Sequence, residues 1–113
     1  MKEDQLNIDE TSLSVDLIDA TQAVKESRFE DALNLLSIVL KEHPDHIDSL
    51  YLAAVSTRYL KKFDDSKKYI DNLMLNAPDM GRAYQELGHL NRDMGNEEKA
   101  VVHYRQACEL NPA

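Results

Sequence analysis

The sequence predicts an all-α fold, built as an array of three helical hairpins, on two observations. Prolines recur every 34 residues, at Pro44, Pro78 and Pro112, and a fixed period of that length is typical of a repeat array. Aligned on this period, small residues and bulky apolar residues fall into columns, as expected where helices approach closely and large side chains fill the space between them. The small columns are Ala20, Ala54 and Gly88, and Ala32, Ser66 and Ala100; the bulky columns are Leu36, Ile70 and Tyr104, and Val39, Leu73 and Ala107.

The first unit, residues 13–46, is expected to follow a polar extension. Residues 1–12 are rich in acidic side chains and offer little to bury, so we expect them to be mobile, or at best a short extension of the first helix. Helices are expected over 14–27 and 30–42 from the spacing of the apolar residues. Asp16 and Asp19 occupy columns that are normally apolar, as expected of a terminal repeat whose outer face meets water.

The second unit, 47–80, and the third, 81–113, show helical spacing without the sustained alternation typical of strands. We expect helices over 47–60 with 64–76, and over 81–94 with 97–110. Gly95 and Asn96 predict a C-terminal stop followed by an N-cap. Acidic pairs begin the second helix of each unit, where the helix dipole explains them without any acid–base role: Asp64 with Asp65, and Glu97 with Glu98.

The repeated columns can be compared with known repeat patterns. The residues that match one of them are Phe29, Ala32, Leu36 and Pro44 in the first unit, Leu50, Ala53, Ala54, Ser66, Ile70 and Pro78 in the second, and Tyr84, Leu87, Gly88, Gly95, Ala100, Tyr104, Ala107 and Pro112 in the third. In these residues the chain resembles the tetratricopeptide repeat (TPR) family. It departs where the family usually has an aromatic residue, at Thr57 and Asn91. The resemblance covers residues 13–112 and implies a single domain over 13–113, a right-handed α-solenoid of three TPR hairpins.

Composition excludes several classes of function. The 113 residues, 42% of them hydrophobic, suffice for one continuous core. A net charge of −8 argues against nucleic-acid binding, which requires a basic stripe. The chain has no apolar run long enough for a membrane span or a signal-peptide core. The single cysteine, Cys108, cannot form an internal disulfide, which makes a cytoplasmic setting the default expectation.

Nothing in the sequence predicts a catalytic, cofactor-binding or metal-binding site, because phosphate-binding loops, zinc motifs and nucleophile elbows are all missing. His43 and His46 could hold a metal, but Pro44 separates them at a hairpin junction and a site needs three or four ligands. We expect instead that Asp45 caps the next helix and that both histidines are solvated. Cys108 is expected to be packed as a small hydrophobic residue.

The functional prediction concerns the first helix of each hairpin. In proteins that this chain resembles, these helices line a concave groove that holds an extended peptide or a partner helix. Spacings of three and four residues place side chains on three stripes: Ser14, Leu17, Thr21 and Val24, then Asp48, Tyr51, Val55 and Arg58, then Arg82, Gln85, His89 and Arg92. The partner-binding residues predicted from them are Tyr51, Val55, Arg58, Arg82, Gln85, His89 and Arg92. The alternative is a solvated charged face with structural tyrosines.

Three arginines on these stripes of an acidic chain suggest a protein or peptide partner that is acidic or bears a carboxylate, because arginine binds carboxylates with paired hydrogen bonds. Binding of a chaperone's C-terminal tail is not expected. The Lys and Asn that the carboxylate-clamping cochaperone subgroup carries on its groove are replaced by Leu17 and Thr21 in the first unit, and by Tyr51 and Val55 in the second.

A second interpretation concerns the last apolar face, since no amphipathic helix follows Pro112. Solenoids ordinarily need such a cap, so we expect either self-association through this face, giving a homo-oligomer, or a longer parent protein. The second and third units are similar to the N-terminal repeats of bacterial proteins in which a TPR array precedes a sulfotransferase domain. That similarity implies an accessory or docking role beside a catalytic domain that this chain lacks.

Overall fold

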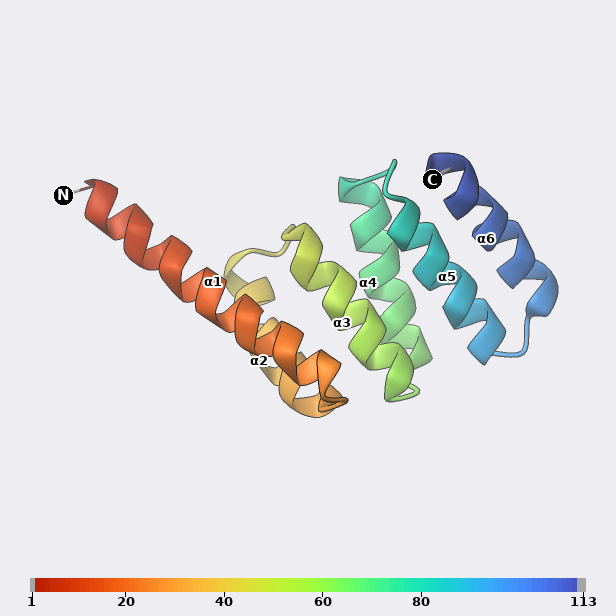
Figure 1. The fold of residues 1–113 in the computed structure, drawn as a ribbon, viewed down its shortest axis with the longest axis horizontal. Coiled ribbons are helices and arrows are strands. Elements are labelled where there is room, and N and C mark those ends of the chain that lie inside the picture. Colours follow the sequence, from red (N-terminus) through yellow and green to blue (C-terminus); the bar gives the residue numbers. More distant parts are fainter. Residues whose placement is uncertain (1, 112–113) are drawn as a thin grey trace.

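The structure, a computed structural model, describes residues 2–111 and, within them, the side chains of residue 13 and residues 15–111. Six helices and no strand are found in this part of the chain. They are α1 (Lys2–Lys25), α2 (Phe29–Glu42), α3 (Ile47–Tyr59), α4 (Phe63–Asn76), α5 (Gly81–Asp93) and α6 (Glu97–Leu110). The predicted all-α repeat fold is therefore confirmed, with the helices paired as α1/α2, α3/α4 and α5/α6 (Figure 1).

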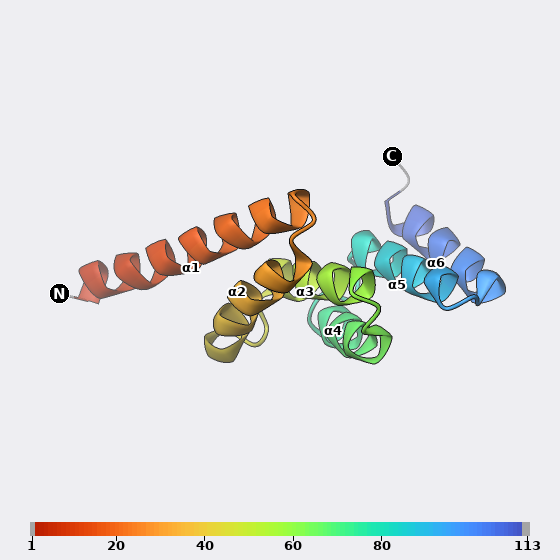
Figure 2. The ribbon, with the colours of Figure 1, turned by 90° about the horizontal axis from the view of Figure 1, so that it is seen from below.

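The three hairpins are stacked in a row. Each first helix packs on the next first helix, α1 on α3 and α3 on α5, while α2 packs on α3 and α4 on α5. The result is an elongated body of 54 × 27 × 23 Å. Figure 2 shows α2 below α1 and α4 below α3, whereas α6 lies above α5. The first helices α1, α3 and α5 contact one another along the row. The functional stripes predicted above lie on these three helices.

The helix bounds agree with the predicted ones to within two residues, with one exception. We predicted that the first helix starts at residue 14, but α1 starts at Lys2 and is 24 residues long. Residues 2–25 contain no proline or glycine, and a polar composition alone does not stop a helix. The helix extends past α2 (Figure 1). The predicted mobility of residues 1–12 stays a prediction.

The three hairpins turn in the same way, through a residue with positive φ that follows the first helix. These residues are Ser27 (φ 59°), Lys61 (φ 62°) and Gly95 (φ 84°). In the third hairpin the N–H of Gly95 donates to the carbonyl of Arg92 at 3.0 Å, and that of Asn96 donates to the carbonyl of Asn91 at 2.7 Å. This pair of bonds is the Schellman motif, which confirms the stop predicted at Gly95.

The predicted N-caps are confirmed only in part. Asn96 is the N-cap residue of α6, as expected, but its side chain makes no capping hydrogen bond in the described structure. The cap of α3 is His46 and not Asp45: the His46 Nδ1 accepts from the Ser49 N–H at 3.3 Å and lies 2.7 Å from the Ser49 hydroxyl. His46 is consequently half-buried, whereas His43 is exposed as expected.

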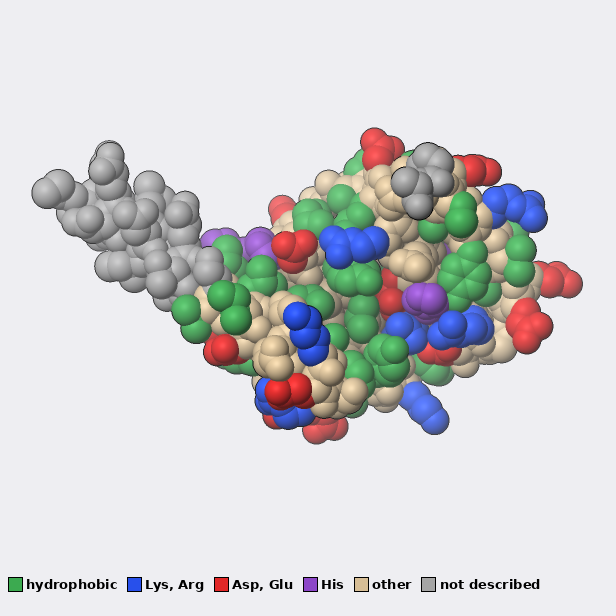
Figure 3. All heavy atoms as spheres, in the orientation of Figure 1, with side chains coloured by type: hydrophobic (Ala, Val, Ile, Leu, Met, Phe, Trp, Pro, Cys, Tyr) green, Lys and Arg blue, Asp and Glu red, His purple; other side chains and the backbone are tan. Residues whose placement is uncertain are grey.

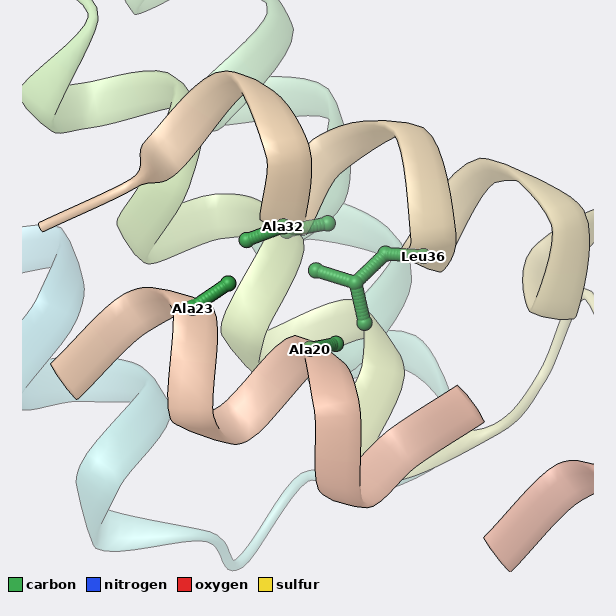
Figure 4. Close-up of a cluster of buried hydrophobic side chains, with 5 residues drawn as sticks. Ala20, Ala23, Ala32 and Leu36 are labelled. Carbon is green, nitrogen blue, oxygen red and sulfur yellow. The ribbon is translucent and has the colours of Figure 1, made fainter. Parts of the chain in front are cut away.

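The core follows the predicted columns. Between α1 and α2, a cluster of Ala20, Ala23, Ala32 and Leu36 is completely buried, and Figure 4 shows these side chains pointing toward one another across the hairpin. The equivalent cluster of the second hairpin joins it to the third, through Ala54, Ile70, Leu87 and Leu90. Small residues thus bring the helices together, and branched residues fill the space, as the period predicts.

The third hairpin keeps the same arrangement with a different division of volume. Gly88 replaces the alanine of the first two hairpins, and the Tyr104 ring replaces Leu36 and Ile70. A Cβ atom at Gly88 would lie only 2.6 Å from the Tyr104 ring. Glycine at this position is therefore what allows the larger aromatic residue to lie against α5.

Cys108 differs from its prediction, because it is exposed and not packed. Its equivalents in the first two hairpins, Leu40 and Met74, are covered by α3 and α5 respectively. No further helix covers α6 in the described part of the chain. The side chain of Cys108 is therefore left at the surface.

Candidate binding groove

The side of the array formed by α1, α3 and α5 carries a hollow of about 320 Å³. All three hairpins contribute to it, and its lining residues are Leu17, Thr21, Asp48, Tyr51, Leu52 and Arg82. We call this hollow the main groove. In Figure 3, hydrophobic side chains occupy the middle of this face, and basic and histidine side chains lie over α5. A pocket of this size can take one or two side chains of a bound segment.

Most of the lining belongs to the predicted stripes. Leu17, Thr21, Tyr51 and Arg82 come together from three helices, because residues three and four apart share a helix face and the first helices lie side by side. Leu52 was missed. It is half-buried and packs on the first core cluster, so it is both a core residue and a wall of the groove, a dual role that stripe spacing does not reveal.

Arg82 and Tyr51 form the chemically most defined part of the main groove. The guanidinium carbon of Arg82 lies 4.8 Å from the centre of the Tyr51 ring, within the range of a cation–π contact. Partial burial raises the pKa of Tyr51 above its ordinary value. Arg82 is exposed. The aromatic ring orients the guanidinium at the surface of the groove.

The structure corrects the role predicted for Arg58. Its side chain is only 6% exposed, and its guanidinium binds both carboxylate oxygens of Glu86 and, at 3.0 Å, an oxygen of Asp93. Burial alone would lower the pKa of Arg58, but the two carboxylates raise it. Burial likewise raises the pKa of Glu86, against the opposing effect of Arg58. Arg58 is thus a buried inter-hairpin contact and does not offer its charge to a ligand.

Arg92 and His89 lie further along α5. Arg92 is exposed, and its guanidinium binds Asp93 at 3.1 Å. The Nδ1 of His89 lies 2.7 Å from the Tyr104 hydroxyl, and the two rings meet edge to face. Burial lowers the pKa of His89, and the positive charges of Arg58 and Arg92 lower it further.

The remaining predicted residues are divided between core and surface. Val55 is buried at 9% exposure, and Val24 packs on the first core cluster. Ser14 and Pro112 lie outside the described side chains. Gln85 is exposed and lines a second, smaller hollow of about 150 Å³ next to the main groove. The lining of this second hollow is Gly81, Arg82, Gln85, Ala107, Cys108 and Asn111.

Two general properties bear on the class of site. No group of three or more histidine, cysteine, aspartate or glutamate side chains in the described residues is placed to hold a metal ion. Among the described helices, none is both long and apolar enough to cross a membrane.

Comparison with known proteins decides the kind of fold. The family model of the tetratricopeptide repeat matches residues 81–113, the third hairpin. The fold is that of a TPR array. The TPR resemblance inferred from the sequence is thereby supported, on the third unit by the family model and on the whole by the structural neighbours. No curated protein matches the chain in sequence.

Solved structures with this fold include MamA and RPAP3. MamA from MSR-1 superposes with a TM-score of 0.78 at 21% identity, over 88% of this chain and 57% of that chain. This chain thus spans little more than half of that MamA chain. The first TPR domain of Spaghetti (RPAP3), bound to the HSP90 peptide SRMEEVD, gives a TM-score of 0.81 at 18% identity, over 90% of this chain and 81% of that one. The first TPR domain of human RPAP3 gives 0.81 at 18% identity, over 88% and 79%.

Proposed function

We propose that this chain is a non-catalytic protein-interaction module that holds a peptide or partner segment in the main groove. The observation that carries the proposal is the hollow lined jointly by Leu17, Tyr51 and Arg82, which come from three different hairpins. Tyrosine and arginine are among the residue types that most often dominate the binding energy of a protein interface. The peptide bound to the RPAP3 domain supports the same kind of use for this fold.

The partner is a protein or peptide that is acidic or bears a carboxylate. Arg82 supports this choice, because it presents a guanidinium at the groove surface. The HSP90 peptide that RPAP3 binds is not the ligand proposed for this chain, because the two proteins are only 18% identical. In addition, the groove here has Leu17 and Thr21 where a carboxylate clamp needs Lys and Asn. A cytoplasmic setting belongs to the proposal as well.

Two alternatives have less support. An accessory region of a larger enzyme, such as a sulfotransferase, finds no counterpart in the structural neighbours MamA and RPAP3. Self-association through the outer face of α6 is favoured by Val101 and Val102, which are 54% and 52% exposed. Light scattering over a wide concentration range tests this second alternative, and a constant monomer mass with and without Val101→Glu would exclude it.

The proposed function is tested by displaying random octapeptides to the purified protein and to Tyr51→Ala, which removes one wall of the main groove. We expect sequence enrichment on the wild-type protein and its loss on the variant. Leu75→Ala is the matched control, because Leu75 is 81% exposed on α4, outside both hollows. Both variants are first checked for helical content and unfolding temperature. Equal enrichment on Tyr51→Ala would remove the main groove as the binding site.

A further inference from the structure

We propose that the main groove selects a segment in which one bulky apolar side chain lies about three residues from a single carboxylate that binds Arg82. The inference rests on the proposed function and narrows the predicted ligand from an acidic partner in general to a segment with two anchors at a fixed spacing. It follows from three features of the groove: which arginine is free to bind, where the apolar walls lie, and where the groove carries its own negative charge.

Arg82 is the basic residue of the main groove that can accept a new carboxylate. Arg58 is buried against Glu86 and Asp93, and Arg92 already binds Asp93. Arg82 forms no ion pair among the described residues. Its guanidinium carbon lies 4.8 Å from the centre of the Tyr51 ring, and its N–H groups can donate paired hydrogen bonds to a carboxylate. One guanidinium matches one carboxylate, and not an acidic run.

The apolar anchor has its place on the other side of Tyr51. Leu17 of α1 and Leu52 of α3 form this wall, and the Thr21 hydroxyl is withdrawn from it, since it donates to the carbonyl of Leu17 at 2.7 Å. A hollow of about 320 Å³ accommodates one leucine, methionine or phenylalanine side chain. Burying such a side chain contributes through the hydrophobic effect, which is independent of the net charge of the chain.

Asp48 determines on which side of the main groove the carboxylate can lie. It lies on the lining of the main groove, in the first turn of α3. A ligand carboxylate at the α3 side would meet this negative charge, whereas one at the α5 side meets Arg82. Packed helices are about 8–10 Å apart, and an extended chain advances about 3.3 Å per residue. The carboxylate should therefore lie about three residues from the apolar side chain, in either direction along the ligand.

Arg82 also marks the path beyond the main groove. It lines the second hollow as well, together with Gln85 of α5 and Asn111 beyond α6. A segment that starts over α1 and passes Arg82 can thus continue toward α6. Crossing from α1 over α3 and α5 to α6 at the spacings given above takes about seven to nine extended residues.

The test is the octapeptide selection repeated on Arg82→Glu, with Arg105→Gln, an exposed site on α6, as control. Wild type and control are expected to enrich one acidic residue about three positions from a bulky apolar one, and Arg82→Glu to enrich Lys or Arg at that position. In a selected peptide, changing the acid to its amide should weaken wild-type binding about five- to tenfold, with less than a twofold effect on Arg82→Gln.

The outcomes separate this inference from the proposed function. Enrichment that is lost on Tyr51→Ala but is the same on wild type and Arg82→Glu would overturn the role of Arg82 and leave the function standing. Peptides with several acids whose binding depends on Arg92 would overturn the single carboxylate. No enrichment on a stably folded wild type would overturn both.

Discussion

The guanidinium of Arg58, at the end of the second hairpin's first helix, binds the carboxylate of Glu86 in the first helix of the third. Both side chains are nearly inaccessible to water, at 6% and 2% exposure. Asp93, the last residue of the third hairpin's first helix, binds the same guanidinium at 3.0 Å. The guanidinium also lies 4.6 Å from the ring centre of Tyr59. The joint between the two hairpins therefore contains a hydrogen-bonded charge cluster, beside the apolar contacts of α4 with α5.

Removing Arg58 should cost far more stability than removing an exposed arginine. Arg58→Ala leaves Glu86 buried without a partner, for which we expect a loss of about 3–5 kcal/mol in the free energy of unfolding. Urea denaturation measures it. Arg105→Ala, on the exposed face of α6, should change the free energy by no more than about 0.5 kcal/mol. Replacing both partners, as Arg58→Met with Glu86→Leu, should recover much of the loss, and a single variant that loses under about 1 kcal/mol would contradict the assignment.

Gly88 and Tyr104 should behave as a coupled pair. Gly88→Ala places a Cβ atom 2.6 Å from the Tyr104 ring, and the forced movement should cost about 1–3 kcal/mol, more than the helix propensity gained from alanine. Adding Tyr104→Ile recreates the pairing of Ala54 with Ile70 and should recover part of that loss. Denaturation of the single and double variants gives the coupling energy, and strictly additive effects would show that the two residues act independently.

Replacing Lys61 with glycine should increase the free energy of unfolding. Its φ of 62° lies in the left-handed region, which side chains with a Cβ adopt at a cost, whereas Gly95 occupies the equivalent place in the third hairpin. After allowance for the greater flexibility of glycine in the unfolded chain, Lys61→Gly should gain about 0.5–1 kcal/mol. Lys68→Gly, in the exposed interior of α4, should lose about 1 kcal/mol. A loss for both variants would contradict the turn geometry. Thermal or urea unfolding distinguishes the two results.

His89 should make stability depend on pH at and below its unfolded pKa, in the weakly acidic range. Its pKa in the folded protein is lowered by burial and by Arg58 and Arg92, so the unfolded chain binds the proton more readily. The stabilisation is fully present above the unfolded pKa of about 6.5 and is lost as the pH falls through the lower folded value. His89→Gln should flatten this part of the profile relative to wild type. Unfolding free energies across the range give the comparison, and identical slopes would rule out His89 as the source.

Much of the fold could be predicted from the sequence because it repeats. A 34-residue period places each helix end in three independent copies, and Gly95 marks one turn directly. The start of α1 could not be found in this way, since residues 2–12 lie before the first copy and contain no helix breaker. The N-cap predicted for α3, Asp45, lies one residue before the observed one, His46. Aspartate is a favoured capping side chain and histidine an uncommon one, which explains the error.

The groove was predictable only where helix geometry alone determines it. Residues such as Leu17, Tyr51 and Arg82 share faces of neighbouring helices, and a spacing of three or four residues suffices to place them together. Arg58 stands on the same stripe by spacing, but its environment depends on Glu86, 28 residues later in the chain. Whether an arginine on one of these stripes is paired internally depends on how two hairpins pack, and this information is not contained in either helix alone.

The alanine cluster between α1 and α2 constrains how this protein can change over evolutionary time. Ala20, Ala23 and Ala32 are fully buried, and nearly every substitution available to an alanine adds volume to a site that has none to spare. Sites filled by Leu36 or Ile70 can exchange one branched residue for another at little cost. Sequence drift in this interior should therefore be concentrated at the large residues, while the closest approach of the first two helices stays nearly fixed.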